Sequence, residues 1–317
     1  MSALRREIRV NHDSRRHRHS RVVLGRAGDD VPQPATGECA IMIHLLNANA
    51  LHIPLAANTV QCVITSPPYW GLRCYGVDAQ LGLEATPDEF LANMVSVFRE
   101  VWRVLKDTGV LFVNMGDSYG DGKQLQGMPW RLAFALQSDG WILRSDIIWH
   151  KPNPMPESVT DRPTKAHEYV FLLSKQGRYF YDADAVRENH VRLWNPLAKN
   201  GSFTGGGIPR AEKADGRIPN PKGRNRRTVW TVATQPYSGS HFATFPTALI
   251  EPMILAGSRP GDLVLDPFSG TATVGEVSRK HHRRYVGLEL NPEYIELAKE
   301  RTRHIQPTLF DFNSVMA

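Results

Sequence analysis

The sequence predicts an α/β fold built on a doubly wound sheet that is mostly parallel, with one antiparallel strand and one inserted irregular region. Two observations predict it. Short apolar runs typical of buried strands alternate with segments of helical periodicity. Residues 263–275 resemble a strand, a tight turn and the first turn of a helix, the unit from which such sheets are built. The 317 residues are 41% hydrophobic and 22% charged, as in an ordinary globular protein.

The elements are expected in the following order. A helix should begin at Pro87, because Thr86 is a good N-cap and acidic residues fill the first turn, and the helical region should end at Gly109. Its apolar stripe is interpreted as core packing. Further helices are expected at 129–138 and 246–256, and strands at 41–46, 60–64, 110–114, 141–149, 168–174, 263–266 and 284–290, with 141–149 and 168–174 as an antiparallel pair.

The hexapeptide Thr65-Ser66-Pro67-Pro68-Tyr69-Trp70 follows the strand at 60–64. Its prolines make a rigid turn at the carboxyl end of the strand, where open α/β sheets bind ligands. The Ser66 hydroxyl and the Pro67 carbonyl can accept both N–H bonds of an exocyclic amine, and Tyr69 can stack on its ring. Trp70 either adds a wall or packs in the interior. The alternative is a surface turn stiffened by proline.

The segment from Asp266 to Glu289 predicts a nucleoside cofactor site. The turn after Asp266 leads into a helix whose N-terminal amides can face the cofactor, and Glu289 ends the next strand 23 positions later, close to the spacing of a ribose-binding carboxylate. The nicotinamide-type glycine pattern is missing. The expected cofactor residues are Asp266, Phe268, Gly270, Thr271, Glu289 and Asn291, with Phe245 and Pro246 closing the pocket.

The net charge of +6 and the isoelectric point near 9.3 favour a polyanionic partner. Residues 1–26 contain eight arginines and are expected to be disordered, as a solvated tail rather than a DNA-binding arm. A Gly/Pro-rich stretch at 195–227 is expected to bind this polyanion through Arg210, Arg217, Lys222, Arg224, Arg226 and Arg227.

Three cysteines without pair or metal spacing indicate a reducing cytoplasm and no metal site. No apolar segment is long enough for a membrane span, and the Arg-rich amino terminus does not resemble a secretory signal.

Taken together, the two motifs resemble those of the amino-group DNA methyltransferases that use S-adenosylmethionine. These enzymes share (Asp/Asn/Ser)-Pro-Pro-Tyr and an Asp-Pro-Phe-x-Gly-Ser-Gly-Thr loop, and the order found here is the permuted β class. The resemblance covers about 41–304, and the stretches 69–73, 114–119, 149–156 and 241–246 are similar to a phage and prophage branch. Ala272 departs from the family glycine and puts a methyl group where the backbone approaches the cofactor closely.

The resemblance implies a Rossmann-like methyltransferase with S-adenosylmethionine as cofactor and double-stranded DNA as partner. The implied organisation is a basic tail (1–38), a catalytic half (39–190), a target-recognition insertion (191–232), a cofactor half (233–306) and a second tail (307–317). Asn49 either replaces the Asp that contacts the cofactor adenine or is only a turn residue. A cytoplasmic, nucleoid-associated protein is expected; a homodimer and a cognate restriction endonuclease stay open.

The implied reaction is methylation of the exocyclic N4 amine of a flipped cytosine in duplex DNA. Cytosine is favoured over the N6 amine of adenine because the family's adenine enzymes more often carry Asp or Asn at the position of Ser66. Two alternatives belong to other classes: an inactive DNA-binding remnant, and a methyltransferase acting on RNA or protein with the same fold.

Overall fold

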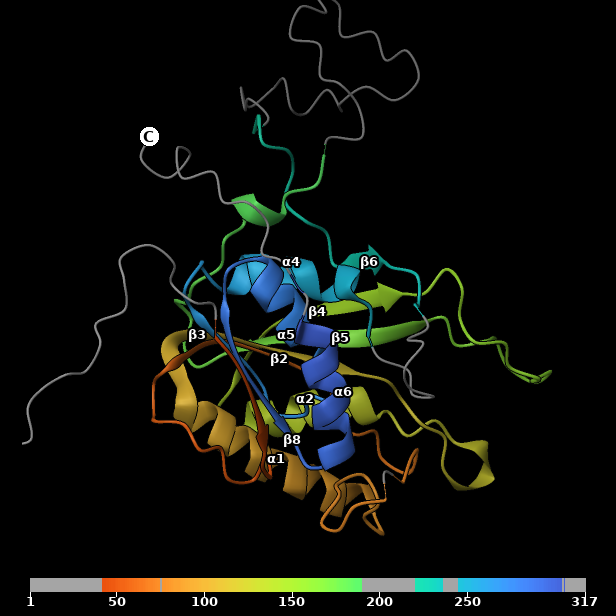
Figure 1. Ribbon diagram of the computed structural model, residues 1–317. Helices are drawn as coiled ribbons and strands as arrows, with labels where there is room; N and C mark the ends of the chain where they lie inside the picture. Colours follow the sequence, from red (N-terminus) through yellow and green to blue (C-terminus); the bar gives the residue numbers. More distant parts are fainter. Residues whose placement is uncertain (1–41, 75, 190–219, 236–244, 304, 306–317) are drawn as a thin grey trace, which may run out of the picture. The chain divides into compact units, whose positions relative to one another are not determined.

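One eight-stranded sheet organises the described part of the computed structural model, which comprises residues 42–74, 76–189, 220–235, 245–303 and 305 (Figure 1). The strand order is β1-β8-β7-β2-β3-β5-β4-β6. The strands are β1 (Ile43–Asn47), β2 (Val60–Thr65), β3 (Leu105–Met115), β4 (Ile142–His150), β5 (His167–Ser174), β6 (Val229–Thr231), β7 (Leu263–Asp266) and β8 (Arg284–Glu289).

Strand β5 alone runs against its neighbours: it is antiparallel to both β3 and β4, and the other pairings in the sheet are parallel. The predicted sheet, mostly parallel with one antiparallel strand, is confirmed. The permuted order is also visible in the pairing. Strand β1 from the amino end pairs with β8, and β2 lies between β7 and β3, so the carboxyl ends of β2, β7 and β8 share one edge.

The helices cover both faces of the sheet (Figure 1). On one face, α1 (Pro87–Val104) and α2 (Met128–Ser138) share a core cluster with Val63 and Leu111. On the other, α4 (Thr247–Gly257), α5 (Thr273–Lys280) and α6 (Pro292–Arg303) contribute to a second cluster with Cys62 and Val110. Neighbouring strand residues therefore face opposite layers, as the period of two requires.

The N-terminus of α1 follows the prediction. Thr86 accepts the Glu89 N–H at 3.2 Å, and the Glu89 carboxylate accepts the Thr86 N–H at 3.3 Å, which completes a capping box. The predicted end of the helix at Gly109 is wrong, because α1 ends at Val104 and β3 begins directly at Leu105. Leu105 pairs with Val60 across the sheet, so tertiary pairing rather than local propensity sets this boundary.

Most of the other predicted elements agree with the structure within one or two residues, apart from residue 41, which lies outside the described residues. The strand expected at 110–114 is the exception, because β3 begins five residues earlier, at Leu105. Helix α6, strand β6 and the short 3-10 helices η1 (Asp121–Lys123) and η2 (Asp184–Val186) were not expected from the sequence. A three-residue strand is too short for a periodic signal. The two tails and most of the predicted insertion lie outside the described residues, so the domain boundaries stay predictions.

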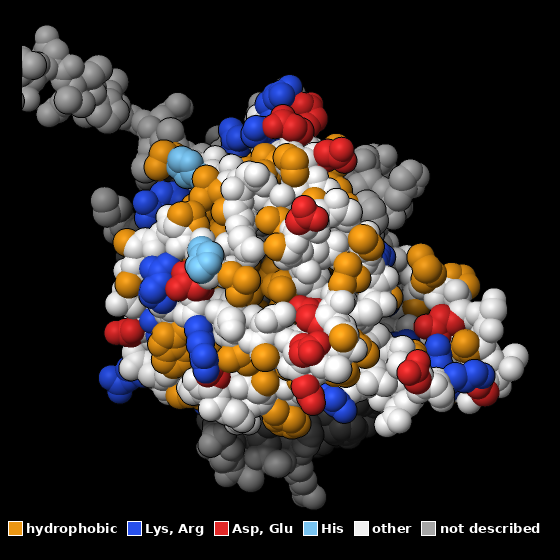
Figure 2. Space-filling view, turned by 90° about the horizontal axis from the view of Figure 1, so that it is seen from below, with side chains coloured by type: hydrophobic (Ala, Val, Ile, Leu, Met, Phe, Trp, Pro, Cys, Tyr) orange, Lys and Arg blue, Asp and Glu red, His pale blue; other side chains and the backbone are white. Residues whose placement is uncertain are grey.

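Charge is mixed on the surface of the described part. Figure 2 shows one face on which basic and acidic side chains are interspersed with apolar ones. Residues 1–26 hold eight arginines and two acidic residues, so this stretch alone equals the net charge of +6 of the chain. The rest of the chain is therefore neutral overall. Among the described residues, no helix is long and apolar enough to cross a membrane.

Candidate active site

The Ser-Pro-Pro-Tyr turn leaves the carboxyl end of β2 and is braced by the loop that follows it. Gly71 donates its N–H to the Gly82 carbonyl at 2.9 Å, and the Trp70 indole donates to the Glu84 carbonyl at 3.0 Å. Trp70 is half-buried against the first core cluster. Of the two roles considered for Trp70, interior packing is therefore the one that the structure shows.

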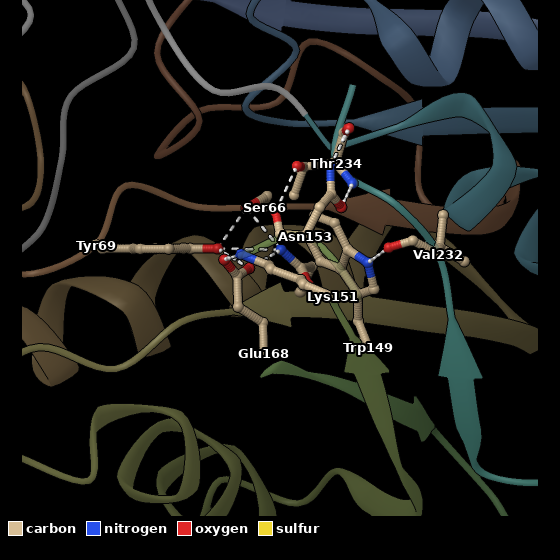
Figure 3. A network of polar contacts seen from close by, with 9 residues as sticks. Ser66, Tyr69, Trp149, Lys151, Asn153, Glu168, Val232 and Thr234 are labelled. Atoms are coloured by element: carbon tan, nitrogen blue, oxygen red, sulfur yellow. Dashed lines mark hydrogen bonds and ion pairs between the residues drawn. The ribbon is translucent and has the colours of Figure 1, made fainter. Parts of the chain in front are cut away.

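A polar network surrounds Ser66 (Figure 3). Glu168 is its centre: one carboxylate oxygen accepts the Tyr69 hydroxyl at 2.7 Å and the Asn114 amide at 2.9 Å, and the other forms an ion pair with Lys151. Asn114 also donates to the Tyr69 hydroxyl at 3.0 Å and to the Ser66 hydroxyl at 3.3 Å. The Ser66 and Tyr69 hydroxyl oxygens lie 3.4 Å apart. The motif is thus held by side chains from two other strands, and Lys151 in turn holds Glu168.

The sequence reasoning missed Asn114, Lys151 and Glu168. Asn114 lies near the end of β3, Lys151 directly follows β4, and Glu168 lies at the start of β5. Because β5 is antiparallel, its first residues lie beside the last residues of β3 and β4: Met115 is paired with Tyr169, for example. Asn114 and Lys151 lie in the stretches 114–119 and 149–156, whose resemblance to the family could have indicated a functional role. Glu168 lies in no such stretch, so nothing in the sequence indicated its role.

Tyr69 is held in one orientation. Its hydroxyl bonds to Glu168, and its ring packs so closely on Gly116 that a Cβ there would lie 2.7 Å from a ring carbon. Burial, with the Glu168 charge adding to it, raises the pKa of the Tyr69 phenol well above its usual value. The phenol therefore stays protonated and donates to Glu168. Stacking of Tyr69 on a base stays a prediction.

The Asp266 carboxylate lies at the end of β7, next to the same edge. Its Oδ1 accepts the Thr65 hydroxyl at 2.7 Å and the Phe268 N–H at 3.0 Å, which connects the turn after β7 to β2, the strand that directly precedes Ser66. Its Oδ2 is buried without a hydrogen-bond partner among the described residues. Burial raises the pKa of Asp266 to about 7.

Glu289, at the end of β8, bridges two backbone segments. Its Oε2 accepts the Gly270 N–H at 2.9 Å and its Oε1 accepts the Asn291 N–H at 2.8 Å. Burial raises the pKa of Glu289 as well. The structure thus brings Asp266, Gly270, Glu289 and Asn291 together, with Phe268 in the same turn. Each carboxylate oxygen of Glu289 retains a lone pair that can accept a ribose hydroxyl.

The side chains of Thr271 and Ala272, in the turn after β7, point into the protein interior. The Thr271 hydroxyl accepts a bond from Arg301 at 3.1 Å, and the side chain is buried. Ala272 is fully buried in the second core cluster, so its methyl group packs in the interior; the expected close approach to the cofactor is wrong. Its φ of 58° and ψ of 44° are left-handed, which explains why a glycine fits this position better.

The remaining cofactor candidates have structural roles in the described residues. Asn49 caps a turn, because its side-chain oxygen accepts the Leu51 N–H at 2.9 Å; the adenine contact stays a prediction. Pro246 is buried at the N-cap of α4, and Phe245 is half-buried against the second core cluster. Closure of the pocket by these two residues also stays a prediction.

The predicted DNA-binding residues divide into two groups. Arg210 and Arg217 lie outside the described residues. The other four interact within the chain: Lys222 pairs with Asp184, Arg224 and Arg227 pair with Glu188, and the Arg226 guanidinium lies 4.6 Å from the Trp230 ring centre.

The Lys222–Asp184 pair lies far from the catalytic edge along the sheet. Phe180, shortly before Asp184, donates its N–H to Thr108. Thr108 precedes Met115 at the end of β3 by seven residues, which correspond to about 23 Å of strand. A role of these residues in DNA binding stays a prediction. Among the described residues, no group of three or more His, Cys, Asp or Glu could hold a metal ion.

Comparison with known proteins identifies the family. The family model described as DNA methylase, of the N6 and N4 type, matches residues 60–300. The chain belongs to this family of DNA methylases. It is similar to the type II methyltransferase M.Cfr9I of Citrobacter freundii, with 48% identity over 78% of this chain and 82% of that protein. It is also similar to M.SmaI of Serratia marcescens, with 46% identity over 78% and 85%. The expected phage-like branch is not shown by these matches.

The fold matches solved structures of DNA methyltransferases. PvuII DNA methyltransferase (cytosine-N4-specific) has a TM-score of 0.64 at 19% identity, covering 87% of this chain and 90% of that one. TTHA0409 of Thermus thermophilus, described as a DNA modification methylase and solved with S-adenosyl-L-methionine, has a TM-score of 0.55 at 25% identity, covering 84% and 95%. The predicted methyltransferase fold is confirmed.

Proposed function

We propose that the protein transfers a methyl group from S-adenosylmethionine to the N4 amine of cytosine in duplex DNA. Membership of the DNA methylase family supports methyl transfer to DNA. S-adenosylmethionine is the methyl donor of such enzymes, and the predicted cofactor agrees with the family. The choice of cytosine is our proposal from the site, and N6 of adenine is the alternative that the experiment below distinguishes.

The cofactor fits the residues at the ends of β7 and β8. S-adenosylmethionine carries an ammonium group and a sulfonium, and the buried Asp266 Oδ2 is an acceptor without a partner among the described residues. A donor or positive group of the cofactor would satisfy this oxygen and favour the ionised carboxylate. Glu289 would accept the ribose hydroxyls. The bound cofactor supplies an electrophilic methyl group; the protein supplies alignment and electrostatics.

The single observation that carries the proposal is the network around Ser66. An aromatic amine is a weak nucleophile, because its lone pair is delocalised into the ring. Bonds from its two N–H groups to the Ser66 hydroxyl and the Pro67 carbonyl would localise that lone pair and stabilise the positive charge of the transition state. Asn114 and Glu168 fix the positions of Ser66 and Tyr69 before the substrate arrives. This preorganisation argues against an inactive DNA-binding remnant.

The residue at position 66 favours cytosine. The family's adenine enzymes more often carry Asp or Asn there, whereas this chain carries Ser66. The amide nitrogen of Asn114 already contacts Ser66, Tyr69 and Glu168, so it can donate to N3 or O2 of cytosine only if one of these contacts is exchanged.

Base-resolved sequencing that distinguishes N4-methylcytosine from N6-methyladenine tests the proposal. DNA from a methylation-free host expressing the wild type should carry N4-methylcytosine at one short sequence. DNA from the Ser66→Ala host should carry little or none, although the variant folds and binds cofactor. N6-methyladenine in the wild-type DNA would contradict the choice of base, and unmodified DNA would contradict the proposed reaction.

Two further experiments concern the partners of the protein. The similar proteins named above are type II methyltransferases, so we propose a cognate restriction endonuclease that cuts the same sequence. Survival of a host that expresses such a nuclease together with the methyltransferase would support this pairing. Chromatography with light scattering would distinguish a monomer from a homodimer, which the sequence left open.

A further inference from the structure

An exposed methionine stands on the loop between β4 and β5. This loop runs out from the edge of the sheet where β4 ends and β5 begins, which is the edge that carries Ser66 and Glu168 (Figure 1). Met155 is 83% exposed, the highest value among the exposed large hydrophobic side chains of the described residues. A single exposed apolar side chain is common on protein surfaces and needs no explanation by itself. What distinguishes Met155 is its place on the loop that leaves the edge carrying Ser66 and Glu168.

The backbone that carries Met155 is stiff. Pro152, Pro154 and Pro156 alternate with Asn153 and Met155, so the tip has restricted φ angles and extended geometry. Rigid presentation means that little conformational entropy of the backbone is lost when the methionine is buried by a partner.

The base of the loop is anchored to the catalytic network (Figure 3). Asn153 exchanges bonds with Thr234: its side-chain oxygen accepts the Thr234 N–H at 3.0 Å, its amide donates to the Thr234 carbonyl at 3.3 Å, and its own carbonyl accepts the Thr234 hydroxyl at 3.2 Å. Lys151, two residues earlier, pairs with Glu168. The base of the loop, through Lys151, and the Ser-Pro-Pro-Tyr motif, through Tyr69, therefore both contact Glu168.

The returning half of the loop is also fixed. Arg162 pairs with Glu157 at 2.6 Å, and its guanidinium lies 4.3 Å from the centre of the Tyr119 ring. Asp161 pairs with Lys123 of η1 at 2.9 Å. Contacts thus hold the loop before and after its tip, while the side chain of Met155 is left mostly to solvent.

The position suits a role in base flipping. Met155 follows Lys151 by four residues, so it lies within about 14 Å of the Lys151 backbone and hence close to the catalytic network. An amine inside a duplex can be reached only after its base leaves the stack, and the gap that remains lies beside the pocket. Methionine is among the apolar residues that proteins insert between base steps.

We propose that Met155 is the wedge that enters the base stack and occupies the space left by the flipped target base. This inference rests on the proposed function. The partner is duplex DNA, and the contact is apolar and independent of the base identity. Met155 would thus stabilise the flipped state without touching the reacting amine.

Methylation rates on two duplexes test the wedge. In one duplex the target base, taken from the sequenced site, is fully paired; in the other it faces a mismatch, which makes flipping easier. Met155→Ala should be slower than the wild type by about tenfold on the paired duplex, because apolar burial is lost. On the mismatched duplex it should approach the wild-type rate. Met155→Leu, which keeps the apolar volume, should stay near the wild type on both.

Met42→Ala is the matched control, since Met42 is also an exposed methionine, at 48%, and lies just before β1. It should behave as the wild type on both duplexes. A fluorescent 2-aminopurine next to the target should brighten on binding of the wild type and less so with Met155→Ala.

Equal rates of Met155→Ala and the wild type on the paired duplex would overturn the wedge, as would an equal loss on both duplexes, which indicates an ordinary DNA contact. A wild type that methylates neither duplex would contradict the proposed function itself.

Discussion

Removal of the Glu168 carboxylate should lower both the free energy of unfolding and kcat, but by different amounts in the Ala and Gln variants. Glu168 pairs with Lys151 and accepts bonds from Tyr69 and Asn114, and the side chains of Lys151 and Glu168 are only 18% and 15% exposed. Glu168→Ala leaves the ammonium without its carboxylate, a change that typically costs about 3–5 kcal/mol of unfolding free energy. Glu168→Gln leaves the same ammonium without a carboxylate but can still accept the Tyr69 hydroxyl, so its cost should be lower than that of Glu168→Ala by about 1–2 kcal/mol.

Activity should respond differently. In both variants the Tyr69 hydroxyl loses its bond to a charged carboxylate, and Asn114, which holds Ser66, loses the same partner. Because one strong hydrogen bond is lost, kcat should fall by about tenfold or more. The KM for S-adenosylmethionine should hardly change, because the predicted cofactor residues lie at the ends of β7 and β8. Steady-state kinetics with a radiolabelled methyl group, combined with urea unfolding, measures both quantities.

A double variant sharpens this test. Replacement of both charges, in Lys151→Met with Glu168→Gln, removes the stranded ammonium and should recover much of the lost stability without recovering kcat. Asp139→Asn is a control, since it breaks an ion pair with the exposed Arg99 and should cost at most about 1 kcal/mol. Wild-type kcat in a folded Glu168→Gln variant would refute the positioning role of Glu168.

Further predictions concern the cofactor half and Ser66. Because the pKa of Asp266 is about 7 against the usual 3.8, the free protein should lose stability as pH rises between these values, and Asp266→Asn should remove that loss in pH-dependent unfolding. Binding of the cationic cofactor should release a proton at about pH 6 but not at about pH 8.5, as calorimetry in two buffers will show. Ala272→Gly relieves a left-handed alanine by about 1–2 kcal/mol but loses about 0.8 kcal/mol of buried methyl packing, so the unfolding free energy measured in urea should change by less than about 1 kcal/mol. Glu289→Ala should weaken cofactor binding by about 1–3 kcal/mol, and an unchanged dissociation constant would remove Glu289 from the site. Ser66→Ala should lower kcat more than affinity; a wild-type rate would contradict the amine-gripping role.

Local signals explain which parts of the fold were predictable. The capping box at Thr86 and the buried strand runs depend on nearby residues, and they agree with the structure. The end of α1 could not be predicted, because the pairing of Leu105 with Val60 overrides the helical pattern. The expectation that Ala272 approaches the cofactor is wrong because the sequence does not reveal that its backbone is left-handed and its methyl group is buried in the core.

The candidate site was predictable only where one segment carries it. Ser66 and Tyr69 are close in sequence, and Asp266 and Glu289 follow a known spacing. Glu168 reaches Tyr69 across 99 positions, through an antiparallel strand whose register no local pattern fixes. The charge argument was also incomplete, since residues 1–26 alone match the net charge of the chain.

The central claim is that the methyl group of S-adenosylmethionine goes to the exocyclic amine of cytosine in DNA. Purified protein should be incubated with isotopically labelled cofactor and unmethylated duplex DNA, and the enzymatically released nucleosides separated by mass spectrometry. The account predicts that the label is found in N4-methyldeoxycytidine and that Ser66→Ala yields almost none. Label in 5-methyldeoxycytidine, in N6-methyldeoxyadenosine, or only in added RNA or protein would contradict it.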